Sequence, residues 1–207
     1  MRIPFDNIVR FILHQSNKFH IDESHSLNHA LNTLNYAKQI YNAEYVNYPY
    51  IQTQQEIIYT SALLHDMCDS KYIDNNMNEL DFIGEFLKEN DYKHSDVYTI
   101  CKIIDCMSYS KTSKYGFPNM KEYQTAYHIV READLLCGYE FNRAILFGIH
   151  RYDLSYNEAF DDSKKIYKER TDNIINNNMF ITDTGKYLSK SLYEVELEKI
   201  RNLEELL

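Results

Sequence analysis

Residues 26–44, S-L-N-H-A-L-N-T-L-N-Y-A-K-Q-I-Y-N-A-E, decide the fold class. The apolar side chains of Leu27, Leu31 and Leu34 recur at intervals of three or four residues, and Ala37 continues the series. This spacing places them on one face of an α-helix, because a helix completes a turn in about 3.6 residues. Residues 26–44 are therefore predicted to form an amphipathic helix.

The same apolar periodicity extends along most of the chain. It predicts further helices over residues 6–18, 53–64, 78–90, 95–107, 123–139, 140–151, from 155 onward, and 184–207. Capping boxes formed by Thr53 with Glu56 and by Ser155 with Glu158 are expected to start two of them, and Ser95 to cap a third. Residues 109–119, Y-S-K-T-S-K-Y-G-F-P-N, are expected to form a loop, because Gly116 and Pro118 interrupt the pattern.

The composition supports a helical fold. The 207 residues include only 5 glycines and 3 prolines, which leaves few positions for the tight turns of an all-β protein. No internal repeat or linker divides the chain. We therefore predict an all-α fold, a bundle of about eight to ten helices forming a single domain over residues 1–207.

The charge and hydropathy of the chain exclude some functions. The formal net charge is −9, which argues against broad binding of duplex nucleic acid but leaves room for a small phosphorylated substrate. No apolar run is long enough for a transmembrane helix, and the N-terminus lacks the pattern of a signal peptide. We expect a cytoplasmic protein that does not bind membranes.

One dipeptide stands out as a candidate for chemistry. In S-A-L-L-H-D-M-C-D-S-K, residues 61–71, an apolar helical segment turns abruptly acidic, and His65 and Asp66 lie at the change. An imidazole and a carboxylate side by side can each donate one ligand atom to a metal ion. By itself such a pair is more often a helix end with solvated polar residues.

Two other regions strengthen the metal interpretation. His25 and His29 are four residues apart, so both project from one face at the start of a helix. Asp134 lies inside the apolar run V-R-E-A-D-L-L, where an unpaired carboxylate would be costly. The alternatives are a solvated helix start for the histidines and a salt bridge from Asp134 to Arg131 or Arg143.

In this order the segments resemble the motifs of the HD superfamily of metal-dependent phosphohydrolases. The matching segments are E-S-H-S-L-N-H-A-L (23–31), A-L-L-H-D-M-C-D-S-K-Y (62–72), I-I-D-C-M-S-Y-S-K (103–111) and E-A-D-L-L (132–136). The third is similar to a segment of small, single-domain nucleotide pyrophosphohydrolase-like members. The resemblance implies a single HD domain with its motif-bearing core at residues 24–151 and C-terminal helices, residues 155–207, packed on it.

The resemblance also implies a metal centre and a reaction. Its metal ligands would be His29, His65, Asp66 and Asp134. A mixed nitrogen and oxygen set with open positions favours one divalent ion, Mn²⁺, Mg²⁺, Fe²⁺, Co²⁺ or Ni²⁺, over a closed structural zinc site. The expected reaction is hydrolysis of a phosphoester or phosphoanhydride bond of a small nucleotide by a metal-activated water.

Two residues are candidates for proton transfer. Asp69, three residues after Asp66, is expected to orient or deprotonate the attacking water, and its alternative role is to pair with Lys71. His25 is expected to protonate the leaving group or bind a substrate phosphate, and its alternative role is packing.

Three lysines are candidates for binding substrate. Lys71 and Lys111 are expected to bind phosphate, Lys71 also contributing to catalysis, and Lys114 is a weaker candidate. The alternative for each is a solvated surface lysine.

Two positions depart from the pattern of the family. Asn32 stands where relatives commonly have an arginine, and Cys137 stands where they often have an aspartate. These departures, with the 19 tyrosines, suggest as one alternative an HD protein that binds a nucleotide or a protein partner without turnover. The other alternative is a phosphodiesterase acting on cyclic or oligomeric nucleotides.

Overall fold

The computed structural model describes residues 3–22, 24–67 and 79–207, and the all-α prediction is confirmed across them. The described residues form ten α-helices and two 3-10 helices and no strand. In chain order these are α1 (Phe5–Phe19), α2 (Leu27–Asn47), η1 (Pro49–Gln54), α3 (Gln55–Leu64), α4 (Glu79–Glu89), α5 (His94–Cys106), α6 (Tyr109–Tyr115), η2 (Lys121–Tyr123), α7 (Gln124–Cys137), α8 (Phe141–Tyr152), α9 (Tyr156–Asn176) and α10 (Asp183–Glu204).

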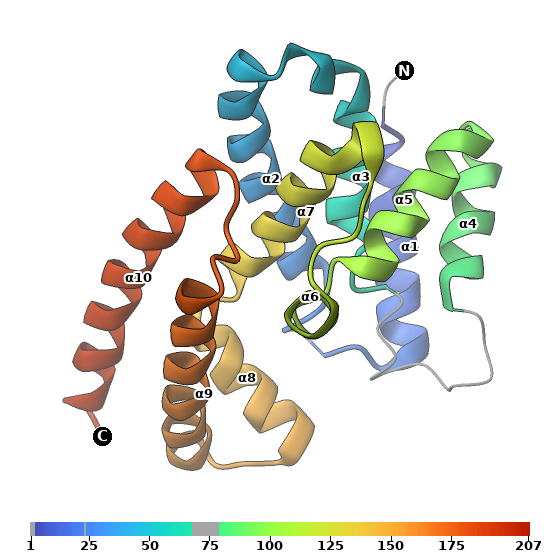
Figure 1. The fold of residues 1–207 in the computed structure, drawn as a ribbon. Helices are drawn as coiled ribbons and strands as arrows, with labels where there is room; N and C mark the ends of the chain where they lie inside the picture. Colours follow the sequence, from blue (N-terminus) through green and yellow to red (C-terminus); the bar gives the residue numbers. More distant parts are fainter. Residues whose placement is uncertain (1–2, 23, 68–78) are drawn as a thin grey trace.

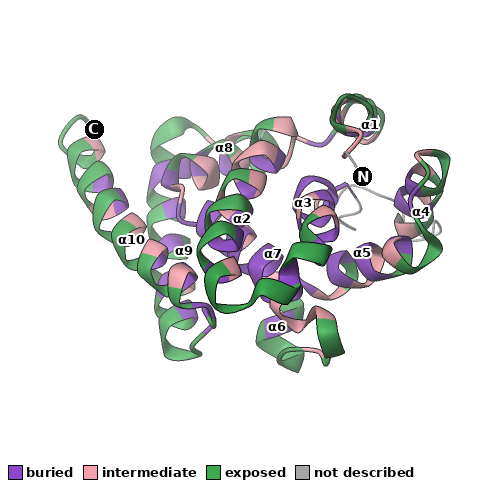
Figure 2. Ribbon diagram, turned by 90° about the horizontal axis from the view of Figure 1, so that it is seen from above, coloured by how far each residue is buried: buried purple, intermediate pink, exposed green. Residues whose placement is uncertain are grey.

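Helix α7 occupies the centre of the molecule. It packs against α2, α3 and α10, and almost every residue from Ala126 to Cys137 is buried (Figures 1 and 2). A helix that is buried on all sides needs apolar residues around its whole circumference, and the run from Ala126 to Val130 supplies them apart from His128. The few polar residues that α7 carries into this core therefore need partners.

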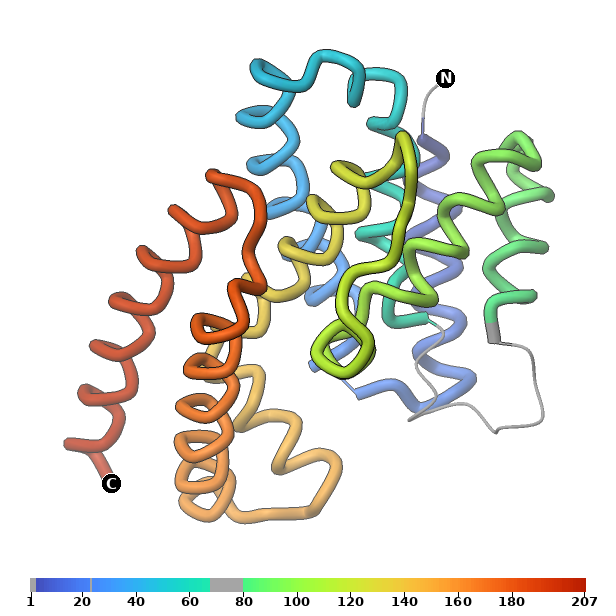
Figure 3. The backbone as a smooth tube through the Cα atoms, viewed as in Figure 1, coloured from blue at the N-terminus to red at the C-terminus, as the bar shows by residue number. Residues whose placement is uncertain are grey.

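The remaining helices form two groups on either side of α7. On one side α5 packs on α3, α4 packs on α5, and α1 contacts α2 and α3. On the other side α8 pairs with α9, and α10 runs along α7 and α2 (Figures 1 and 3). Among the residues described, no helix combines the length and apolar character needed to cross a bilayer.

The capping box at Ser155 is confirmed. The Ser155 hydroxyl accepts a hydrogen bond from the backbone N–H of Glu158, and the Glu158 carboxylate accepts one from the backbone N–H of Ser155. These reciprocal bonds satisfy two donors that a helix start leaves without partners. Helix α9 accordingly begins at Tyr156.

The two other predicted caps are wrong. Thr53 lies within η1, where its hydroxyl donates to the carbonyl of Tyr50 at 3.1 Å, so α3 begins two residues later, at Gln55. Pro49 favours this earlier turn because its fixed φ suits a helix start. Ser95 is inside α5, which begins at His94, and its hydroxyl bonds to Asp96 instead of capping.

The predicted loop over residues 109–119 is wrong in its first part, which forms α6. Ser108 caps this helix by accepting a hydrogen bond from the backbone N–H of Lys111, and Thr112 is buried beneath it. Gly116 ends the helix with φ of 74°, a conformation that residues with a side chain rarely adopt. The sequence pattern did not predict α6, because this short helix has no apolar stripe of its own.

Candidate metal centre

Packing of α7 against α2 and α3 brings the four predicted metal ligands together. His29 lies in the first turn of α2, His65 and Asp66 follow the last residue of α3, and Asp134 lies on α7. Both histidines are buried, with exposed fractions of 3% and 8%. Residues 105 positions apart in sequence thus meet at one point in the core.

Nitrogen and oxygen atoms converge at this point. The Nε2 atoms of His29 and His65 are 2.9 Å apart, and each lies 3.4 Å from Oδ1 of Asp134. The carboxylate of Asp66 bridges the pair, with Oδ2 3.1 Å from His29 Nε2 and Oδ1 3.3 Å from His65 Nε2. Ligand atoms of His29, His65 and Asp66 all lie within 4.8 Å of one another, and Asp134 faces the two imidazoles.

A hydrogen bond behind the cluster orients the imidazole of His65. Nδ1 of His65 lies 2.9 Å from the carbonyl oxygen of Ala62, which can only accept, so Nδ1 carries the proton of this bond. In neutral His65 the lone pair is then on Nε2, the atom that faces the cluster. A backbone carbonyl behind an imidazole is a common way of orienting a metal-ligating histidine.

The charges in the cluster shift one another's pKa values. Burial disfavours ionisation of Asp66 and Asp134, but the two histidines outweigh burial and lower both carboxyl pKa values. Burial likewise disfavours protonated His65, but Asp66 and Asp134 raise its pKa to about 9. Without a metal the cluster therefore holds protons, and a metal ion would have to displace them.

The alternative partners considered for Asp134 are not the ones observed. Within the described part of the chain, Asp134 forms no ion pair with Arg131 or Arg143 and contacts the two histidines instead. Arg131 is fully buried and pairs with Glu132 at 3.2 Å. Arg143 approaches Asp66, with Nη2 3.6 Å from Oδ2.

A cavity of about 360 Å³ opens beside the cluster, with Asp66 and Asp134 in its wall. Other parts of the wall come from α6, from the end of α7, and from α8 and α9. Two arginines, Arg143 on α8 and Arg170 on α9, line it together with Phe147. The volume falls in the range of small-molecule sites, and the arginines suit an anionic ligand.

His25 is the one predicted substrate residue that the described structure places in this cavity. Its Nδ1 lies 2.6 Å from the hydroxyl of Ser24, and its ring packs edge-on against Phe147 with ring centres 5.5 Å apart. Asp69 and Lys71 lie outside the described residues. Their predicted roles stay predictions.

The structure does not bring Lys111 and Lys114 to the cavity wall. The ammonium group of Lys111 pairs with the Asp105 carboxylate at 2.7 Å, on the surface of the molecule. That of Lys114 lies 5.0 Å from the centre of the Tyr115 ring. These lysines are near the motifs in sequence, but both lie on α6 and contact Asp105 and Tyr115 instead of lining the cavity.

Both departures from the family pattern lie close to the site. The amide of Asn32 donates to the Glu140 carboxylate at 3.3 Å, and Glu140 lines the cavity. Burial raises the pKa of Glu140. The Cys137 thiol lies 3.4 Å from the Thr33 hydroxyl in the core, where burial raises its pKa.

Sequence reasoning missed the two cavity arginines as binding residues. Arg143 came up only as a partner for Asp134, and Arg170 was not singled out. No signal in the sequence marks Arg170. It lies more than 30 residues after Asp134 in the chain, and only the tertiary structure brings both residues to the same cavity.

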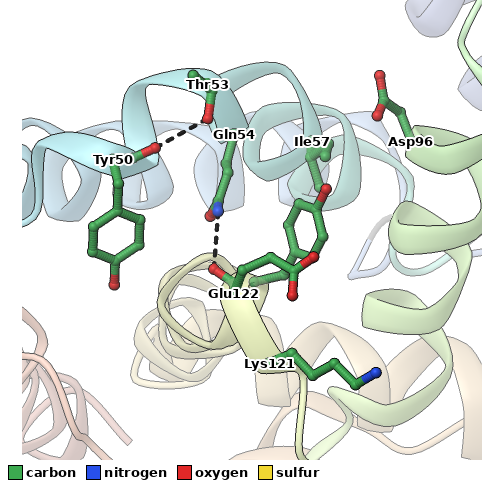
Figure 4. A pocket seen from close by; sticks show the side chains of 8 residues that line it. Tyr50, Thr53, Gln54, Ile57, Asp96, Lys121 and Glu122 are labelled. Atoms are coloured by element: carbon green, nitrogen blue, oxygen red, sulfur yellow. Dashed lines mark hydrogen bonds between the residues drawn. The ribbon is translucent and has the colours of Figure 1, made fainter.

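A second cavity, of about 530 Å³, lies between η1, η2 and α5 (Figure 4). Gln54 spans it by donating to the carbonyl of Glu122 at 2.9 Å. Its wall includes Asp96 and Lys121 but none of the residues of the histidine–aspartate cluster. Although larger, this cavity has no converging donor atoms, so the smaller cavity is the candidate site.

Comparison with known proteins extends the fold but not the function. No protein-family model and no curated protein matches the sequence. The chain is similar in structure to a Lactobacillus plantarum protein solved by crystallography, with a TM-score of 0.66 over 97% of this chain and 94% of that one. The two sequences are 17% identical, a level at which the similarity shows a shared helical arrangement and no more.

Proposed function

We propose that the protein is a metal-dependent phosphohydrolase of the HD type, acting on a phosphoester or phosphoanhydride bond of a small nucleotide. One observation carries the proposal: His29, His65, Asp66 and Asp134 converge beside a cavity lined by two arginines. The donor atoms suit a cation, and the arginines suit a phosphate.

The residues present fit a divalent metal ion. Nδ1 of His65 is bonded to a backbone carbonyl, so its Nε2 can serve as a ligand. Oδ2 of Asp66 is buried without a hydrogen-bond partner among the described residues, although His29 Nε2 lies 3.1 Å away as an ion-pair partner. A set of two imidazoles and two carboxylates suits Mn²⁺, Mg²⁺, Fe²⁺, Co²⁺ or Ni²⁺.

The bound ion would lower the pKa of a coordinated water and offset negative charge on the phosphoryl group. Arg143, which approaches Asp66, is placed to orient a phosphoryl oxygen beside the cluster. In the hydrolysis, the water oxygen bonds to phosphorus, the bond to the leaving oxygen breaks, and the water's proton passes to a base. His25 is the candidate to protonate the leaving oxygen, and Asp69 stays the predicted base.

The experiment uses protein stripped of metal and then reloaded with Mn²⁺. Release of phosphate or pyrophosphate is measured across nucleoside mono-, di- and triphosphates and cyclic dinucleotides, with metal content measured in parallel. Asp66→Ala is expected to abolish release. Asp162→Ala, which removes a carboxylate from the exposed face of α9, is the matched control and is expected to retain it.

The products distinguish the alternatives. Cleavage of only cyclic or oligomeric nucleotides would indicate a phosphodiesterase with the same metal centre. A nucleotide that raises the melting temperature of metal-loaded protein but is recovered unchanged would indicate binding without turnover. A protein that binds no divalent metal would contradict the proposal.

A further inference from the structure

Arg170 belongs to the cavity although it lies outside the motif-bearing core. It is on α9, and its guanidinium group lies over the Tyr109 ring, with Cζ 5.1 Å from the ring centre. On its other side is Gly138, just after α7. A helix from the C-terminal part of the chain thus contributes a cation to the wall of the candidate active site.

Gly138 makes room for this guanidinium group. A Cβ atom at position 138 would lie 2.9 Å from Nη2 of Arg170 and 3.0 Å from its Cζ. Real Cβ atoms are rarely found so close to other heavy atoms, so any larger residue would push Arg170 aside. The position of Arg170 therefore depends on the absence of a side chain at residue 138.

In the described part of the chain no carboxylate pairs directly with Arg170, although Asp134 attracts it from farther away. Among the described residues it forms no ion pair within 4 Å, and its Nε is buried without a hydrogen-bond partner. Burial lowers its pKa, and nearby Arg143 lowers it further, while Asp134 raises it. Arg170 is half-buried, and a half-buried cation that lacks an ion-pair partner in the protein can take its partner from a ligand.

The two arginines occupy different walls of the same cavity. Arg143 comes from α8 and approaches Asp66 of the metal cluster, whereas Arg170 comes from α9 and packs on Tyr109. The same wall carries Asp66, Asp134 and Glu140, and a ligand with several negative charges lying between the two arginines would reduce their mutual repulsion further. A guanidinium group also binds two phosphate oxygens at once, which suits a phosphate chain.

We propose that Arg170 binds a second phosphoryl group of the substrate, so that the site selects nucleoside di- and triphosphates over monophosphates. This inference rests on the proposed function for the phosphoryl group held at the metal cluster. Arg143 serves that reacting group, and Arg170 serves the next phosphate along the chain.

The test measures binding, which needs no turnover. Metal-loaded protein, freed of excess metal, is titrated calorimetrically with inorganic pyrophosphate and with inorganic phosphate. Arg170→Gln is expected to weaken pyrophosphate binding about tenfold to a hundredfold and to change phosphate binding much less. Lys168→Gln, the same loss of charge on the exposed face of the same helix, is expected to change neither.

Two further variants separate a binding role from a structural one. Gly138→Ala keeps Arg170 but displaces its guanidinium group, so it is expected to reproduce the loss of pyrophosphate preference. Arg170→Gln is expected to leave the melting temperature of ligand-free protein unchanged or raised, because it removes an unbalanced buried charge. Equal weakening of both anions, or a lower melting temperature with the preference intact, would overturn the inference.

Its failure is distinguishable from failure of the proposed function. If wild-type protein hydrolyses nucleotides but Arg170→Gln keeps the same ratio of diphosphate to monophosphate activity, the role of Arg170 is refuted and the function stands. If no nucleotide is hydrolysed, the function fails, and the titrations still show whether Arg170 selects pyrophosphate.

Discussion

Helix α7 carries two acidic residues into the core, and their surroundings are opposite. Glu132 is fully buried, and its carboxylate accepts hydrogen bonds from the backbone N–H groups of Ile181 at 2.7 Å and Thr182 at 3.2 Å, and from Arg131. The Asp134 side chain is 16% exposed, and its ion-pair partners among the described residues are the imidazole nitrogens of His29 and His65. Two positions along a helix turn a side chain by about 200°, so the pair points to opposite sides.

The comparison separates a carboxylate with a structural role from one to which we propose a functional role. Glu132 links α7 to the start of α10 through donors that are all part of the fold, and nothing further is needed to balance it. The neighbours of Asp134 are themselves good metal ligands and lie beside a cavity. Both residues carry a carboxylate on the same helix, but only Asp134 has neighbours that could share a cation with it.

The largest expected effect is on the structural side of this comparison. Glu132→Ala should lower the free energy of unfolding by about 3–5 kcal/mol, because it leaves the charge of Arg131 buried without its partner. Urea denaturation followed by circular dichroism measures the change. A loss below about 1 kcal/mol would show that Arg131 finds another partner and that Glu132 is not structural.

For Asp134, the expected effect is a loss of the stability that the protein gains on binding a metal ion. Wild-type protein in Mn²⁺ at a hundred times its dissociation constant should gain about 2.7 kcal/mol of stability. Asp134→Asn should lose most of that gain, because an amide is a poorer metal ligand than a carboxylate. Thermal melts with and without Mn²⁺ measure the gain in each protein. Asp105→Asn, at an exposed carboxylate, should keep the gain. An equal gain in the Asp134 variant would remove Asp134 from the ligand set.

A smaller effect is expected from changing the packing around the Glu132 carboxylate. A Cβ atom at position 185 would lie 2.1 Å from the Glu132 carboxylate, so Gly185→Ala should cost about 1–3 kcal/mol. Gly84→Ala, within helix α4, is the control. A Cβ atom there would come no closer than 3.9 Å to a neighbouring side chain, and alanine favours a helix more than glycine does. Denaturant midpoints of the two variants should therefore shift in opposite directions.

The smallest effect concerns His128, one turn before Glu132 on α7. Burial and then the charge of Arg131 lower its pKa to about 4, and the side-chain amide of Gln124 donates to its Nε2 at 3.0 Å. The unfolded chain, with an ordinary pKa of about 6.5, binds this proton first, so stability should fall by about 1–3 kcal/mol between pH 6.5 and pH 4. His128→Gln should flatten that slope in urea titrations at several pH values. An unchanged slope would mean that His128 titrates normally in the folded protein.

The sequence allowed the helices to be predicted wherever apolar residues repeat at helical spacing. The expected ranges 26–44 and 184–207 correspond to α2 and α10 within a few residues. The errors fell on short elements. Helix α6 and the 3-10 helix η1 have too few residues for a periodic pattern, and their starts depend on a single serine or proline.

For the site, the motifs pointed to His29, His65, Asp66 and Asp134, and the structure brings these four together. His65, Asp66 and Asp134 could be singled out as polar residues in or at the end of apolar helical runs, and His29 by its spacing of four residues from His25. The candidate substrate-binding residues were harder to predict than the candidate metal ligands, because arginines and lysines are common on helix surfaces. Lys111 looked well placed by spacing but pairs with Asp105, whereas Arg170 looked ordinary but lines the cavity.

By itself the sequence determined the helical character of the chain and the donor atoms of the candidate metal centre, because both depend on residue type and local spacing. Only the tertiary structure decided which cations reach that centre. The packing of α9 on α8 and the missing side chain at Gly138, just after α7, place Arg170 in the cavity. Such contacts join residues far apart in the chain, and local sequence patterns carry no information about them.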